Sequence, residues 1–158
     1  VSSKVGPALR QPVVGRGAAY LDYDNDGDLD LLIASSNGPA RLLRNDNGNQ
    51  NDVLRVKTVG VRSNRDGIGA RVMVHMASGA RMSAMVKSGS SYLSQSELPL
   101  TFGIGKPDPN KRISLEILWP SGHKDSFKDI HPNQFITVKE GKGIVDAQPV
   151  NFVLKPAK

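Results

Sequence analysis

Cysteine is absent from the sequence, so disulfide bonds, thiolate metal ligands and a cysteine nucleophile are all excluded. A secreted chain without disulfides can gain stability from a bound metal ion instead. The 158 residues contain no apolar run long enough to cross a bilayer, so we expect no membrane span. No charged and then apolar leader follows Val1, which predicts that a signal peptide is either absent or already removed.

Helical patterns are scarce as well. No stretch of about twelve residues keeps an apolar stripe at helical spacing, and 16 Gly with 10 Pro interrupt the chain throughout. Short alternating segments separated by turn residues recur instead, which predicts an all-β fold, either a β-sandwich or a barrel. The segments that we expect to form strands are 17–21, 29–34, 40–44, 53–61, 70–77, 80–87, 98–102, 113–119, 125–127, 135–139, 144–145 and 152–154.

Two local signals indicate how strands connect and where the chain divides. Ser78-Gly79 is a two-residue connection between alternating segments and predicts the clearest hairpin of the chain. The run 45–52 is rich in Asn, Asp and Gly, which favour turns, and it reads as a boundary. We therefore expect one unit at 1–48 and a second at 49–158.

Positive charge exceeds negative charge by six, but unevenly. The segment 22–30 holds five of the 15 acids and no base, so ten acids face 21 bases in the rest of the chain. That excess could reflect nucleic acid, acidic glycans or a membrane surface as partners. The bases are scattered, with no cluster longer than Lys111–Arg112, and aromatics that could stack on bases are few. We therefore expect no nucleic-acid binding.

The acidic segment carries the strongest chemical signal. Asp22, Asp24, Asp26, Asp28 and Asp30 alternate along it. Five like charges in nine residues repel one another, and a hard divalent cation reverses that repulsion. Gly27 stands at position 6 of the loop, where a sharp turn needs a residue that tolerates positive φ. The pattern predicts a metal loop, and the alternative is a solvated acidic turn that binds nothing specific.

Ca²⁺ is the ion that we expect, because it accepts six to eight oxygens in a flexible shell whereas Mg²⁺ demands a stricter octahedron. By analogy with known Ca²⁺ loops, Asp22, Asp24, Asp26 and Asp30 would bind through side chains and Asp28 mainly through its carbonyl. The loop is not an EF-hand, since position 12 is Ile33 rather than Glu and strand patterns flank it.

The motif GRGAAYLDYDNDGDLDLLIAS, within residues 14–36, resembles one FG-GAP (VCBS-type) repeat of integrin-like β-propellers. The resemblance implies a Ca²⁺ loop between two strands of a propeller blade. A propeller closes only with several blades, and a single copy is present here. Residues 1–48 would then be a partial blade, the tail or remnant of a larger propeller.

From about residue 45 onward the chain resembles the ASPIC/UnbV domain that follows such repeats in the cartilage acidic protein-like family. The residues that carry this resemblance are SNRDGIGARV (63–72), GSSYLSQSELPLTFGIG (89–105), WPSG (119–122) and NQFITVKEG (133–141). The family implies extracellular or cell-envelope proteins with adhesion or matrix-type interactions. It does not imply a reaction.

Other polar groups suggest no coherent catalytic site. Ser121, His123 and Asp125 lie too close in sequence to provide the geometry of a hydrolase triad. The serine-rich segment 89–105 could contact a sugar or peptide, or its hydroxyls could cap its own backbone. Trp119 is expected to fill the core. We therefore expect no enzyme activity.

The sequence predicts a non-enzymatic, extracellular or cell-envelope, calcium-binding interaction or adhesion module whose partner is a protein or glycan. One alternative is an accessory or catalytic domain of a biosynthetic or hydrolytic enzyme, because UnbV-type proteins accompany specialised-metabolite pathways. A second alternative is a structural cap that contacts an upstream propeller and shields its sheet edge.

Overall fold

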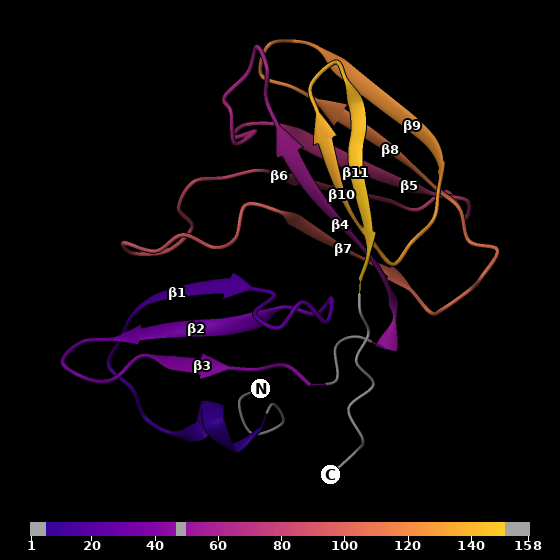
Figure 1. Ribbon diagram of the computed structural model, residues 1–158. Helices are drawn as coiled ribbons and strands as arrows, with labels where there is room; N and C mark the ends of the chain where they lie inside the picture. Colours follow the sequence, from indigo (N-terminus) through magenta and orange to yellow (C-terminus); the bar gives the residue numbers. More distant parts are fainter. Residues whose placement is uncertain (1–5, 47–49, 151–158) are drawn as a thin grey trace.

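The chain folds into β-sheets, as Figure 1 shows for a computed structural model that describes residues 6–46 and 50–150. Within these ranges three sheets form, and the helical structure includes a 3₁₀ turn at Pro7–Arg10. None of the described helices is long and apolar enough to cross a membrane. The all-β prediction is therefore confirmed, whereas the expected strand at 152–154 lies outside the described residues.

A small sheet comes first in the chain. Its antiparallel strands, in the order β1-β2-β3, are β1 (Gly15–Leu21), β2 (Asp30–Ser35) and β3 (Arg41–Leu43). The acidic loop 22–29 joins β1 to β2, as the apolar segments on both sides of it predicted.

Two four-stranded sheets make up the rest of the described chain. The first has the order β11-β10-β4-β7, and its strands are β4 (Asp52–Val59), β7 (Leu100–Gly105), β10 (Gln134–Lys139) and β11 (Gly143–Pro149). The second has the order β6-β5-β8-β9, and its strands are β5 (Arg71–Met76), β6 (Arg81–Met85), β8 (Ile113–Leu118) and β9 (Lys124–Ile130). The predicted hairpin at Ser78-Gly79 is confirmed by the β5–β6 pairing.

The two larger sheets pack face to face around one apolar core (Figure 1). Alternate residues of both sheets point inward, as period-two strands require. Trp119 joins this core, as predicted, and its Nε1 donates to Asp125 Oδ2 at 2.8 Å. The core residues of the central strands are Leu54, Val56, Val72, Val74, Ile113, Leu115, Ile117, Ile136 and Val138.

Two separate open sheets enclose the core, and their strands do not join into a closed barrel. Among the described residues, β11 and β7 end one sheet and β6 and β9 end the other. The sandwich prediction is therefore confirmed, and the barrel alternative is wrong. The physical reason is that each sheet ends in a strand that pairs on one side only, so closure into a barrel does not occur.

Glu140, directly after β10, holds two loops of the sandwich together. Its Oε2 accepts hydrogen bonds from three successive backbone amides, and its Oε1 accepts two hydroxyls. The donors are the amides of Val61 (2.7 Å), Arg62 (2.8 Å) and Ser63 (2.8 Å), the hydroxyl of Ser63 (2.9 Å) and the hydroxyl of Ser121. A buried carboxylate that accepts several hydrogen bonds is stabilised in its charged form.

Burial alone would raise the pKa of Glu140, but the hydrogen bonds from Ser121 and from the three amides outweigh it and hold the pKa well below its usual range. A carboxyl whose pKa is lower in the folded state contributes stability above its unfolded pKa of about 4.5. That contribution is lost as the pH falls below 4.5 toward the folded pKa.

We predict that Glu140→Gln lowers the free energy of unfolding at pH 7 by about 2 kcal/mol, because charge-assisted hydrogen bonds are lost. The variant should also lose less stability than the parent chain between about pH 4.5 and pH 2, as measured by urea unfolding at several pH values. Glu116→Gln is the matched control, because Glu116 forms a more exposed pair with Lys124 at 2.7 Å. Parallel pH profiles for Glu140→Gln and the parent would contradict this assignment.

Candidate metal centre

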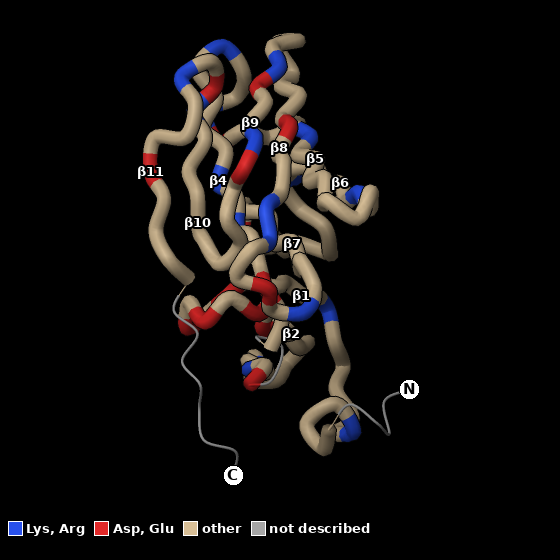
Figure 2. Tube along the Cα trace, turned by 90° about the vertical axis from the view of Figure 1, so that its right-hand side faces the viewer, with Lys and Arg blue, Asp and Glu red and all other residues tan. Residues whose placement is uncertain are grey.

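The acidic loop lies between β1 and β2, on the side of the small sheet that faces the sandwich (Figure 2). Figure 2 shows acidic residues gathered there, whereas Lys and Arg are dispersed over the molecule. Gly27 has a φ of 91°, which confirms the predicted need for a residue without a Cβ at this turn. The loop thus curls back on itself and brings its side chains together.

Three of the five predicted aspartates form one cluster. Asp22, Asp24 and Asp30 each offer a carboxylate oxygen, and these oxygens lie within 4.8 Å of one another. Asp22 and Asp30 are buried, and Asp24 is half-buried. Among the described residues, this is the group of acidic side chains that could bind a metal ion. Asp26 and Asp28 are buried beside the cluster but are not part of it.

Backbone amides fix the orientation of two of the three carboxylates, those of Asp22 and Asp30. Asp22 accepts hydrogen bonds from the amides of Asp26 and Gly27, both at 3.1 Å. Asp30 accepts from the amides of Tyr23 at 2.8 Å and Asn45 at 2.7 Å. These bonds hold the Asp22 carboxylate to the loop, and they hold the Asp30 carboxylate both to the loop and to the segment after β3.

The Asp26 side chain forms a hydrogen bond with the backbone of the loop. Its Oδ1 accepts the backbone amide of Asp28 at 3.2 Å. The prediction that Asp26 binds a metal through its side chain, and that Asp28 binds through its carbonyl, therefore remains a prediction.

A buried cation from the sandwich reaches the same cluster. Arg55 of β4 donates from Nη1 to Asp22 at 2.7 Å and from Nη2 to Glu97 at 2.5 Å. Its side chain is only 4% exposed, and its guanidinium lies 4.9 Å from the centroid of the Phe135 ring. The acidic loop is therefore joined to the outer face of the sheet through a buried ion pair.

Sequence reasoning did not find Arg55 or Glu97. Arg55 alternates with the core residues Leu54 and Val56, and a polar residue at such a position normally faces solvent. Its contacts with Asp22, Glu97 and Phe135, which all lie far away in sequence, accompany its burial. No local pattern marks those contacts.

The electrostatic balance at Asp22 favours a cation. Burial raises the pKa of Asp22 above its usual value, and the nearby Glu97 carboxylate raises it further. Arg55 and the amides of Gly27 and Asp26 lower the pKa but do not fully compensate. A positive ion among the three carboxylates would favour their charged forms and so offset the cost of burial.

The serine-rich segment 89–105 covers the edge of β1. The hydroxyls of Ser91 and Ser96 accept hydrogen bonds from the amides of Ala18 and Tyr20, both at 3.2 Å, and the amide of Glu97 donates to the Tyr20 carbonyl at 3.0 Å. These bonds satisfy an edge that would otherwise be open to pairing. The predicted capping of its own backbone holds for Ser94, whose hydroxyl donates to the Tyr92 carbonyl at 2.9 Å, whereas Ser91 and Ser96 cap β1 instead.

Gly17 is required for this contact. A Cβ at Gly17 would lie 2.1 Å from Ser94 Oγ and 2.6 Å from the Tyr92 carbonyl oxygen. Any larger residue would push the serine-rich segment away from β1.

Ser121, His123 and Asp125 do not assemble a hydrolase triad. The His123 ring lies 3.2 Å from Asp125, but the Ser121 hydroxyl donates to Glu140 and accepts the backbone amide of His123. A nucleophile needs its base within hydrogen-bond reach of the hydroxyl, and here the Glu140 carboxylate occupies that place.

Comparisons with known proteins support the family resemblance of the second half of the chain. The family model described as ASPIC and UnbV matches residues 60–145. Cartilage acidic protein 1 of Homo sapiens is 32% identical over an alignment of 123 residues that covers 74% of this chain and 18% of that protein. The Xenopus tropicalis protein of the same name is 31% identical over an alignment of 114 residues that covers 68% of this chain and 16% of that protein.

The chain thus spans less than a fifth of the length of these curated relatives. A solved structure from Bacteroides ovatus, of a protein provisionally assigned to cell adhesion, covers 85% of this chain and 58% of its own with 10% identity. Its TM-score of 0.28 is too low to carry an argument. The family match leaves out residues 14–36, so the FG-GAP resemblance remains a prediction.

We predict that Arg55→Met destabilises the chain by about 3 kcal/mol, because it leaves Asp22 and Glu97 without their cation in a buried setting. Arg44→Met is the matched control, since Arg44 pairs with Asp46 in an exposed position and its removal should cost less than about 1 kcal/mol. Urea unfolding of both variants measures the difference. Equal effects of the two substitutions would show that the buried pair does not hold the loop.

Proposed function

Because this chain belongs to the ASPIC and UnbV family, we propose that it is a non-enzymatic, extracellular interaction module stabilised by Ca²⁺. Its acidic loop would bind the ion, and its loop surfaces would meet a protein or glycan partner. The cluster of Asp22, Asp24 and Asp30 is the observation that carries the proposal.

The donor set supports a hard cation. Carboxylate oxygens are the ligands that Ca²⁺ prefers, and three of them already lie within 4.8 Å of one another. Ca²⁺ takes six to eight oxygens, so the Asp26 side chain, the Asp28 carbonyl and water would complete the shell. Mg²⁺ fits less well, because it demands a stricter octahedron and gives up its waters reluctantly.

The ion would act on the fold as well as on the loop. Asp22 is both a proposed ligand and the partner of Arg55 at 2.7 Å. An ion that fixes Asp22 therefore also fixes the small sheet against the sandwich. The proposed role of Ca²⁺ is to make these two parts one rigid surface for a partner.

A structural cap of an upstream propeller is the second candidate. One face of the small sheet exposes apolar side chains, with Leu42 at 42% and Leu32 at 39% exposed, and these two residues pair directly between β2 and β3. A sheet that shows apolar residues to solvent favours contact with a further part of a longer protein. On this account Leu32→Lys should leave the unfolding midpoint of the chain unchanged, and a large drop would show instead that Leu32 is needed within the chain.

We predict that Ca²⁺ raises the thermal unfolding midpoint of the chain relative to chelator, because an ion that binds only the folded state stabilises it. Mg²⁺ at the same concentration should raise the midpoint less. Asp24→Asn should remove most of the Ca²⁺ effect and weaken Ca²⁺ binding more than tenfold, as measured by calorimetric titration.

Asp146→Asn is the control for that measurement. Asp146 is exposed on β11, where it accepts a hydrogen bond from the Gln148 side chain at 3.2 Å. Its substitution changes the net charge equally and should leave the Ca²⁺ effect intact. Equal midpoints with Ca²⁺, Mg²⁺ and chelator would rule out the proposed metal site.

A further inference from the structure

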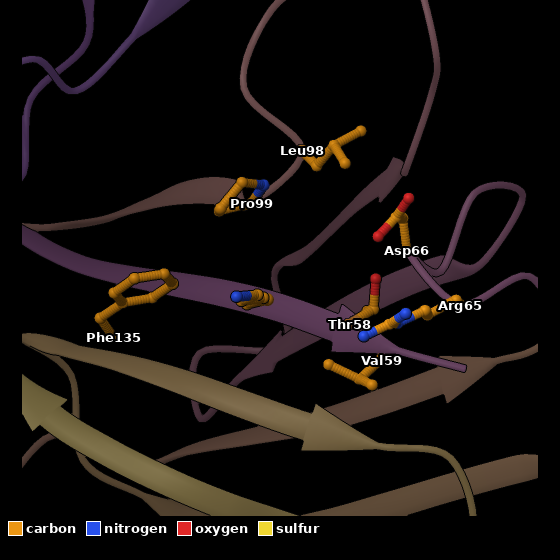
Figure 3. Close-up of a pocket in the computed structure, with 8 residues that line it drawn as sticks. Thr58, Val59, Arg65, Asp66, Leu98, Pro99 and Phe135 are labelled. Carbon is orange, nitrogen blue, oxygen red and sulfur yellow. The ribbon is translucent and has the colours of Figure 1, made fainter. Parts of the chain in front are cut away.

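A second concave site lies on the sandwich, away from the acidic cluster. It is a cavity of about 530 Å³ beside β4 and β10, a size within the range of roughly 300–1,000 Å³ that small-molecule sites occupy. Figure 3 shows Phe135 at one end and Arg65 with Asp66 at the other, while Leu98 and Pro99 lie along one side.

Two cations line this cavity without an ion-pair partner among the described residues. Lys57 extends from β4, and Arg65 lies in the loop after it; both side chains are exposed. The loop backbone around Arg65 is fixed, because the amide of Gly60 donates to the Arg65 carbonyl at 3.1 Å and the amide of Gly67 to the Asn64 carbonyl at 2.8 Å. Two cations that line one cavity suit an anionic ligand.

The remaining lining is that of a sugar site rather than of a simple ion site. Phe135 offers an aromatic ring, whose centroid lies 4.9 Å from the Arg55 guanidinium, and Leu98 and Pro99 add apolar surface. The Asp66 carboxylate can accept hydroxyl donors. Thr58 also lines the cavity, but its hydroxyl is buried from solvent and is not an accessible ligand group.

We propose that this cavity binds an acidic saccharide, with Lys57 and Arg65 on its carboxylate or sulfate groups and Phe135 against a sugar ring. This inference rests on the proposed role as an interaction module and names the glycan side of that role. The charge of the chain outside the acidic loop favours the same class, since 21 bases there face ten acids.

The test is calorimetric titration of the full chain with a heparin hexasaccharide, a galacturonate hexasaccharide and neutral maltohexaose. We expect binding of at least one acidic saccharide and none of the neutral one. Lys57→Glu and Arg65→Glu should each weaken that binding more than tenfold, and Phe135→Leu should weaken it several-fold. Lys128→Glu is the matched control, since Lys128 is exposed on β9 of the other sheet and its substitution changes the net charge equally.

Each other outcome overturns the inference. Equal losses for Lys128→Glu and Lys57→Glu would mean attraction by net charge alone. Absence of binding, or equal binding of maltohexaose, would exclude an acidic saccharide. A single-stranded oligonucleotide that binds as tightly, with the same sensitivity to Lys57→Glu and Arg65→Glu, would assign the cavity to nucleic acid instead.

These results are separable from a failure of the calcium proposal. The titrations are run with Ca²⁺ and with chelator, and the thermal midpoint of each variant is recorded in both. A Ca²⁺-dependent midpoint without saccharide binding would overturn only the cavity assignment.

Discussion

The buried guanidinium of Arg55 is the contact on which the arrangement of this molecule depends. It lies on the outer face of a sandwich sheet and binds Asp22 of the acidic loop and Glu97 of the serine-rich segment at once. Two carboxylates buried with one guanidinium are stable only while all three stay together, because any one left alone would be a buried charge without a partner. The small sheet, the segment that caps its edge and the sandwich are therefore coupled through one side chain.

This coupling gives the acidic loop a structural role in addition to the proposed metal site. Asp22 takes part in the carboxylate cluster and in the ion pair, and the same guanidinium lies against Phe135 of the proposed saccharide cavity. A cation at the cluster and a ligand at the cavity would thus both contact side chains that touch Arg55. No large movement is required, because Asp22, Glu97 and Phe135 already surround that residue.

The sequence predicted those parts of the structure that local patterns determine. Alternation placed Val72 and Val74 in the core, and the spacing of the aspartates located the acidic cluster before any geometry was known. Strand β9 extends over Lys124–Ile130 rather than 125–127, because pairing with β8 holds residues whose own pattern is not apolar. Arg55 could not be predicted, because its burial accompanies contacts with segments 33 and 42 residues away in sequence.

Hydrogen–deuterium exchange of the full chain with saturating Ca²⁺ and with chelator tests the central claim most directly. If the ion holds the acidic loop and, through Arg55, the small sheet, the amides of Tyr23, Asp26 and Gly27 should exchange more slowly with Ca²⁺. The protection should extend to the amides of Ala18 and Tyr20 in β1, which donate to serine hydroxyls of the serine-rich segment. Identical exchange at these positions in both conditions would contradict the claim that a bound cation joins the two parts.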